Sequence, residues 1–127
     1  MRAYLYIFHP LCFLPRKKEK TVIREARYQA RLINTIKERL PGCIVLKNDS
    51  GYLPGVPDLL ILYNERWAAL EVKTRANSDY QPNQEHYVSK MNEMSFANAI
   101  YPENEAEVLD DLQRTLRAGG ATRFPQS

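Results

Sequence analysis

Two carboxylates and an amine stand at the ends of two apolar segments, in positions that suit a divalent metal. Asp58 precedes the apolar run 59–63, and Glu71 and Lys73 close a second run that starts at Trp67. Buried or half-buried ionisable groups are costly unless they are paired or bound to a metal. Because two facing carboxylates repel each other, we expect a cation between them, with the lysine beside it.

The spacing of the two runs predicts a β-hairpin that brings these groups together. A polar pair at 64–65 separates the runs, and a two-residue loop there sets Tyr63 opposite Arg66. Counting outward along both strands then sets Asp58 opposite Glu71, and cross-strand neighbours have Cβ atoms about 5 Å apart on one face. The lysine two residues further on shares that face because side chains alternate along a strand.

The remaining pattern predicts a mixed α/β domain in which helices flank a central mixed β-sheet. The expected helices cover 20–40, 81–93 and 102–116, and the expected strands cover 43–46, 59–63, 67–72 and 96–100. We expect residues 1–18 to form an N-terminal extension, 19–117 a single folded domain and 118–127 a flexible tail.

The first expected helix places a further carboxylate among apolar residues. At 100° per residue its apolar sector contains Val22, Ala26, Ile33, Ile36 and Leu40. Glu25 falls within this sector, so we expect its side chain to turn towards the core or towards a cleft. The opposite side of the helix carries Arg24, Arg27, Arg31 and Glu38.

Size and composition fit one domain and exclude several kinds of protein. The chain has 127 residues, of which 26% are charged and 44% hydrophobic, and its net charge is +3. Two cysteines and two histidines are too few for a disulfide framework or a zinc site, which favours the cytoplasm. The apolar start of the chain is interrupted by His9 and Pro10 and is too short to span a bilayer, so we expect neither a signal peptide nor a membrane partner. No small-molecule cofactor is expected beyond a metal.

The motif around these residues resembles a known nuclease signature. Pro57-Asp58 followed by Glu71-Val72-Lys73 looks like the PD-(D/E)xK pattern. The wider pattern is most similar to the VRR-NUC branch, in its standalone, phage-type, Holliday-junction-resolvase-like form. The residues that carry this likeness are Glu25 on a helix, Gly55, Pro57, Asp58 and Leu59, the Glu-x-Lys strand, and Gln84 and Tyr87 on a later helix. The chain departs from the branch at 99–102, which lacks its arginine-rich ending.

The resemblance implies a restriction-endonuclease-like core and a Mg²⁺-dependent DNA endonuclease, with Mn²⁺ able to replace Mg²⁺. The metal ligands it implies are Glu25, Asp58, Glu71 and the carbonyl of Val72, and the catalytic residues are Glu25, Asp58, Glu71, Lys73 and Gln84. Lys73 would orient and polarise the attacking water, and Gln84 would hold the lysine or contact a phosphate. The products would be a 3′-hydroxyl and a 5′-phosphate.

The resemblance also implies a homodimer that acts on branched DNA such as four-way junctions. The process would be DNA recombination or repair in a bacterial or phage-infected cell. Two other functions stay open. The first is a non-catalytic nucleic-acid-binding subunit with a nuclease-like fold. The second is a nuclease that cuts RNA, or that nicks or cuts single strands in replication or repair.

Polar and basic residues gather where a DNA substrate would be gripped. The expected DNA contacts are Arg16, Lys17, Lys18, Lys20, Arg24, Arg27, Arg31, Lys47, Ser50 and Arg75. A stripe of this kind would bind several phosphates, and its binding would weaken steeply with salt. A solvated helix face remains the alternative for the row from Arg24 to Arg31. No helix-turn-helix, zinc-finger or RNP pattern is present, so we do not expect base-specific recognition.

Overall fold

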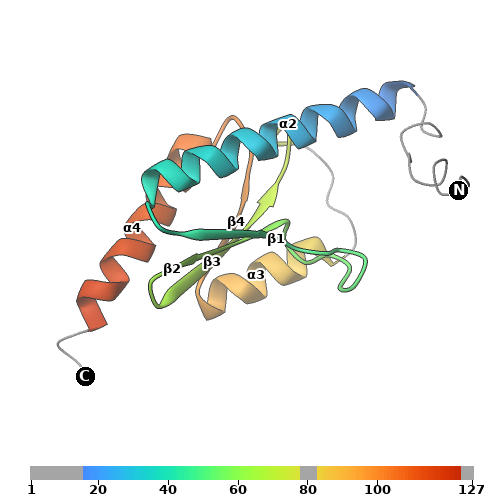
Figure 1. The fold of residues 1–127 in the computed structure, drawn as a ribbon. Coiled ribbons are helices and arrows are strands. Elements are labelled where there is room, and N and C mark those ends of the chain that lie inside the picture. Colours follow the sequence, from blue (N-terminus) through green and yellow to red (C-terminus); the bar gives the residue numbers. More distant parts are fainter. Residues whose placement is uncertain (1–15, 78–82, 124–127) are drawn as a thin grey trace, which may run out of the picture.

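The computed structural model describes residues 16–77 and 83–123, and it has the mixed α/β architecture expected from the sequence (Figure 1). The elements are, in chain order, α2 (Arg16–Arg39), β1 (Ile44–Lys47), β2 (Leu59–Tyr63), β3 (Arg66–Val72), α3 (Gln84–Met94), β4 (Phe96–Ile100) and α4 (Glu105–Arg123). The predictions for 1–15, 78–82 and 124–127 lie outside the described residues.

Four strands form one mixed sheet in the order β1-β2-β3-β4. The first three are antiparallel neighbours, and β4 runs parallel to β3, after the helical crossover that parallel neighbours need. The hairpin register is as predicted, because Tyr63 pairs with Arg66 and Leu59 pairs with Leu70. Asn64 in the loop takes the left-handed conformation, at φ 55°, that favours a tight hairpin turn.

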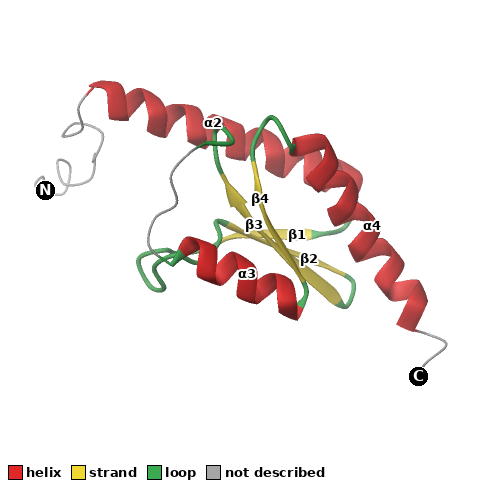
Figure 2. Ribbon diagram, turned by 180° about the vertical axis from the view of Figure 1, so that it is seen from behind, coloured by secondary structure: helices red, strands yellow, loops and turns green. Residues whose placement is uncertain are grey.

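Helices cover both faces of this sheet. Figures 1 and 2 show α2 and α4 on one side of the sheet and α3 on the other. The main core lies in the first of these layers, where Leu32, Ile36 and Leu40 of α2 are buried together with Leu112 and Leu116 of α4. Burying each such side chain contributes about 2 kcal/mol to the stability of the fold. The packing of this layer therefore fixes the position of the strands, whose ends carry the ionisable residues.

The first helix is longer than the layer it covers, which corrects the predicted apolar sector. α2 begins at Arg16, before the expected start at residue 20, and its buried residues begin only at Tyr28. Val22 and Ala26, which were predicted to face the core, are exposed. The N-terminal half of the helix runs past the sheet (Figure 1). Periodicity therefore identified the side of the helix that faces the core. It did not show how much of the helix the sheet covers.

The second helix begins at Gln84, which corrects the start predicted near Gln81 and Pro82. Asn83 precedes the helix with φ 74°, a left-handed conformation that a helix cannot continue. Gly55, at φ 93°, packs directly against this residue, and a Cβ on Gly55 would lie 2.6 Å from the Asn83 Cβ. A contact between distant segments therefore sets where α3 starts.

Several further boundaries differ from the prediction, most of them by one to three residues. β1 covers Ile44–Lys47, one residue later than expected, because the Cys43 N–H bonds to the Leu40 carbonyl and so belongs to the turn that ends α2. α4 continues to Arg123, beyond the end predicted near residue 116, so the glycines at 119 and 120 do not end it. In the part of the chain that the structure describes, no helix has both the length and the apolar composition to cross a membrane.

Candidate functional site

Asp58, Glu71 and Lys73 converge at one end of the sheet. Asp58 stands just before β2, Glu71 lies in β3, and Lys73 follows directly after β3. The Val72 N–H donates to Asp58 Oδ2 at 2.7 Å, and Lys73 Nζ lies 3.8 Å from Glu71 Oε2. The structure thus brings together the two carboxylates and the amine that the hairpin register placed on one face.

Hydrogen bonds outside the sheet fix the backbone on both sides of this cluster. Asn48 holds the segment before β2, since its N–H donates to the Asp58 carbonyl at 2.9 Å and its Nδ2 donates to the Pro57 carbonyl at 2.7 Å. On the other side, the Lys73 N–H donates to the Ile100 carbonyl at 2.9 Å and extends the pairing of β3 with β4 by one residue. Hydrogen bonds therefore hold the backbone next to the ionisable side chains on both sides of the cluster.

Gln84, the first residue of α3, joins the carboxylate of Glu71 to the amine of Lys73. Its Nε2 donates to Glu71 Oε2 at 2.7 Å, and its Oε1 accepts a hydrogen bond from Lys73 Nζ at 2.9 Å. This orientation of the amide follows from chemistry, because an ammonium group can only donate, so the amide oxygen must face Lys73 and the amide nitrogen Glu71. The contact between Gly55 and Asn83 sets the helix start and so places this amide.

Burial shifts the protonation of both carboxylates. Glu71 and Lys73 are 2% and 7% exposed. Burial first, and then the charge of Asp58, raise the pKa of Glu71 from its ordinary 4.5 to about 8, against the opposing effect of Lys73. Burial also raises the pKa of Asp58, and the Val72 N–H and Lys73 partly offset that rise. The cluster therefore tends to hold a proton wherever no other cation compensates its charge.

Glu25 lies at the rim of this cluster and does not enter it. Its residue is exposed, yet partial loss of hydration raises the pKa of its carboxyl, followed by the charge of Asp58, while Lys73 lowers the pKa. The Glu25 carboxyl on α2 is thus close enough to Asp58 and Lys73 to respond to their charges. Within 16–77 and 83–123, however, no three His, Cys, Asp or Glu side chains are close enough together to hold a metal. The structure thus does not join Glu25 to Asp58 and Glu71 in one ligand group.

The atoms at the cluster nevertheless fit a hard divalent cation. Glu71 Oε1 is buried and has no hydrogen-bond partner among the described residues, a costly state for a polar atom. The Val72 N–H points to Asp58, and the next N–H, of Lys73, points to β4. Because the N–H and C=O of one strand residue point to the same side, the Val72 carbonyl also faces the Asp58 side. Carboxylate and carbonyl oxygens are the ligands that Mg²⁺ and Mn²⁺ prefer.

The residues expected to contact DNA fall into separate groups. A hollow beside α2 is lined by Lys20, Ile23, Arg24, Arg27, Tyr28, Arg31, Thr74 and Pro102. Ser50 lines a second hollow, which it shares with Asp58 and Gln84. Lys47, at the end of β1, and Arg75, just after β3, are exposed and line neither. Arg16, Lys17 and Lys18 form the start of α2, and their side chains lie outside the described residues.

Three residues that position the cluster had no such role in the prediction from sequence. Asn48 holds the backbone before β2. The positive φ of Gly55 and its close approach to Asn83 were also missed. The signal for this contact in the sequence is a glycine within a proline-rich turn.

No family model, curated protein or solved structure matches this chain.

Proposed function

We propose that this chain is a Mg²⁺-dependent DNA endonuclease of the PD-(D/E)xK kind, with a restriction-endonuclease-like core. One observation carries the proposal. Glu71 presents a buried carboxylate oxygen with no partner among the described residues, and Gln84 joins its other oxygen to the amine of Lys73. An apolar sheet gains no stability from this arrangement, whereas hydrolysis of a phosphodiester needs both a cation site and a positioned amine.

In this proposal the chain's own groups divide the work. Asp58, Glu71 and the Val72 carbonyl hold Mg²⁺, which Mn²⁺ can replace, and the bound metal supplies polarisation of the phosphate and compensation of its charge. Lys73 orients the attacking water and offsets negative charge on the phosphate. Gln84 keeps that amine in place. Glu25 acts from the rim through a water molecule, and the products are a 3′-hydroxyl and a 5′-phosphate.

A homodimer and branched DNA are the finer part of the proposal. β1 is an edge strand with exposed Ile44 and Leu46, which pair with Leu62 and Leu60 of β2 and so share one face with them. An exposed apolar edge is a surface that proteins usually cover. If the β1 strands of two copies paired about a two-fold axis, each copy would cover the exposed edge of the other. Two copies would then carry two sites, one for each strand cut at a four-way junction.

Strand cleavage in the presence of metal tests the activity directly. Supercoiled plasmid, single strands and a four-way junction are incubated with Mg²⁺, with Mn²⁺ or with EDTA. We expect metal-dependent cutting that disappears in Asp58→Ala and Lys73→Ala and persists in Lys37→Ala, a control lysine far along α2.

The enzyme would meet such a substrate in the cytoplasm of a bacterial or phage-infected cell.

The outcomes separate the candidate functions. Tight DNA binding without cleavage in either metal would replace the enzyme with a binding subunit. Cutting of single strands alone, or of one strand of the plasmid alone, would favour a nicking or single-strand nuclease. Junctions cut no better than linear duplex would remove the branched substrate and leave the nuclease. Light scattering tests the dimer, which Leu46→Lys should convert to a monomer.

A further inference from the structure

A basic hollow lies on the other side of the strand end that carries Lys73. The hollow measures about 510 Å³, and α2 supplies most of its lining. Thr74, just after β3, and Pro102, just after β4, close it from the sheet side. Three segments far apart in the sequence thus meet around it, so it is a concave surface and not merely one face of a solvated helix.

Among the described residues, four cationic side chains and no acidic side chain line this hollow. In the described part of the chain, the side chains of Lys20, Arg24 and Arg27 make no ion pair. Arg31 lies 3.6 Å from Glu105, and its guanidinium stacks over the ring of Tyr28 at 5.0 Å. Like charges around one hollow repel, and an anion placed there would relieve the repulsion.

The hollow and the carboxylate cluster are neighbours that face different ways. Lys73 reaches Glu71 and Gln84, whereas Thr74 lines the hollow, as expected when successive side chains of an extended chain alternate. On α2, Glu25 lies close to the cluster and its neighbour Arg24 lines the hollow. A ligand long enough to reach both would pass across the end of β3.

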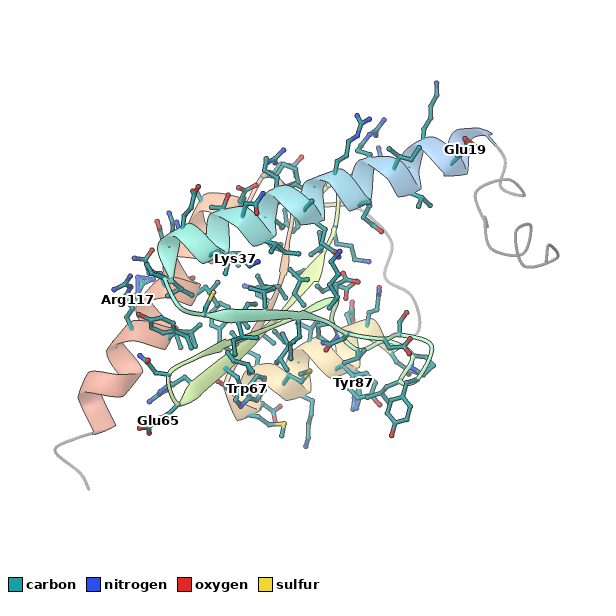
Figure 3. All side chains as sticks on the ribbon, in the orientation of Figure 1. Glu19, Lys37, Glu65, Trp67, Tyr87 and Arg117 are labelled. Carbon is teal, nitrogen blue, oxygen red and sulfur yellow. The ribbon has the colours of Figure 1, made fainter. Side chains whose placement is uncertain are left out.

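The chemistry of the lining favours a phosphate chain. Guanidinium groups form paired hydrogen bonds with phosphate oxygens, and the Thr74 hydroxyl can add a further donor. From Lys20 to Arg31, α2 rises roughly 16 Å at 1.5 Å per residue, which matches about five nucleotide steps of a duplex at 3.4 Å each. Figure 3 shows nitrogen-tipped side chains projecting from α2 between Glu19 and Lys37.

We propose that this hollow is a second binding site for the sugar-phosphate backbone of nucleic acid, formed by Lys20, Arg24, Arg27 and Arg31 and separate from the metal cluster. The choice of nucleic acid as the ligand rests on the proposed function. The hollow holds substrate away from the phosphodiester that is cut. Its removal therefore weakens binding without abolishing hydrolysis of a substrate already bound.

Binding measured without cleavage tests the site. The full chain is titrated in EDTA against a fluorescent four-way junction, by anisotropy, between about 50 and 200 mM salt. Loss of two phosphate contacts lowers the slope of log affinity against log salt by about 2. We therefore expect Arg24→Gln/Arg27→Gln to bind more weakly than the native chain. The ratio of the two affinities should be about tenfold larger at the lowest salt concentration than at the highest. Lys37→Gln/Lys90→Gln removes the same charge elsewhere and should keep most of the slope.

Equal slopes for the two double variants would overturn the proposal, because general charge would then explain binding. A cleavage assay in Mg²⁺ then distinguishes failure of the second binding site from failure of the proposed nuclease function. If the nuclease is right and the hollow is not, Arg24→Gln/Arg27→Gln will cut junctions with an unchanged KM. If the hollow is right and the nuclease is not, the binding difference will stand without any cleavage. Stronger binding to vesicles containing anionic lipid than to the junction would assign the hollow to a membrane surface instead.

Discussion

Replacing Glu71 by glutamine should stabilise the metal-free protein, by an amount that grows with pH. The folded-state pKa of this carboxyl is about 8, against 4.5 in the unfolded chain. The folded protein therefore holds a proton that the unfolded chain releases. Stability is fully present below the unfolded value and is lost as pH rises towards the folded value. Glutamine mimics the protonated side chain and cannot lose that stability.

The size of the effect follows from the gap between the two values. At pH 7 the carboxyl is ionised in the unfolded chain and protonated in the folded protein. The interval between the unfolded pKa of 4.5 and pH 7 lowers the free energy of unfolding by on the order of 3 kcal/mol. At pH 5 the cost is about 1 kcal/mol or less. In Glu71→Gln the amide oxygen can still accept from Gln84 Nε2, as Glu71 Oε2 does now.

Urea unfolding from pH 5 to pH 8 in EDTA measures the free energy of unfolding of the native chain and of the variant. The difference between these two free energies isolates the effect of Glu71. Glu93→Gln, an exposed change on α3, serves as the matched control and should show no trend. A difference that stays flat across this range would show that Glu71 ionises normally, and the description of the buried cluster would then be wrong. Added Mg²⁺ should reverse the order, since metal at a hundred times its Kd stabilises the native chain by about 3 kcal/mol and the variant lacks the charged ligand.

Other changes probe the parts that support the cluster. Gln84→Ala removes a hydrogen bond from both a buried carboxylate and a buried ammonium, so urea unfolding should show a loss of about 2–3 kcal/mol, and cleavage should fall although no proposed metal ligand has changed. Gly55→Ala forces a side chain into φ 93° and against Asn83, which should cost about 1–3 kcal/mol from backbone strain alone. Tyr28→Phe deletes the 3.1 Å bond to Glu105 and should cost about 1 kcal/mol, with little effect on cleavage. Metal binding should tighten from pH 6 to pH 8, because the cation must displace the proton of the buried carboxyl, and calorimetry in two buffers would detect the proton released.

The hairpin was predictable because its geometry is local. A two-residue loop fixes every cross-strand pair, and the observed pairs from Tyr63–Arg66 to Leu59–Leu70 follow that arithmetic. The convergence of Asp58, Glu71 and Lys73 is the continuation of the same register. The mixed sheet with flanking helices was predictable from the alternating runs of helical and extended pattern, whereas the order of the strands within it came only from the structure.

The errors occurred where distant segments meet. Helical periodicity showed which side of α2 is apolar, but the sheet ends before Val22 and Ala26, so they remain exposed. The start of α3 depends on a left-handed Asn83 packed against Gly55, and no local rule connects these two positions. The basic row on α2 was visible in the sequence, whereas its closure into a hollow by Thr74 and Pro102 was not.

The cost of the buried cluster is itself an argument about function. Leu70 and Val72, on either side of Glu71 in β3, are apolar and buried, and an apolar side chain in place of Glu71 would remove both its desolvation and its repulsion from Asp58. Pairing with Lys73 compensates little, because a buried ion pair seldom repays the loss of hydration. Asp58 also lines the hollow with Ser50, and Thr74, next to Lys73, lines the basic hollow. A protein selected for stability alone would place its expensive charges elsewhere, so the cost of the cluster favours the proposed metal site, with the separate basic hollow beside it as the proposed site for a chain of phosphates.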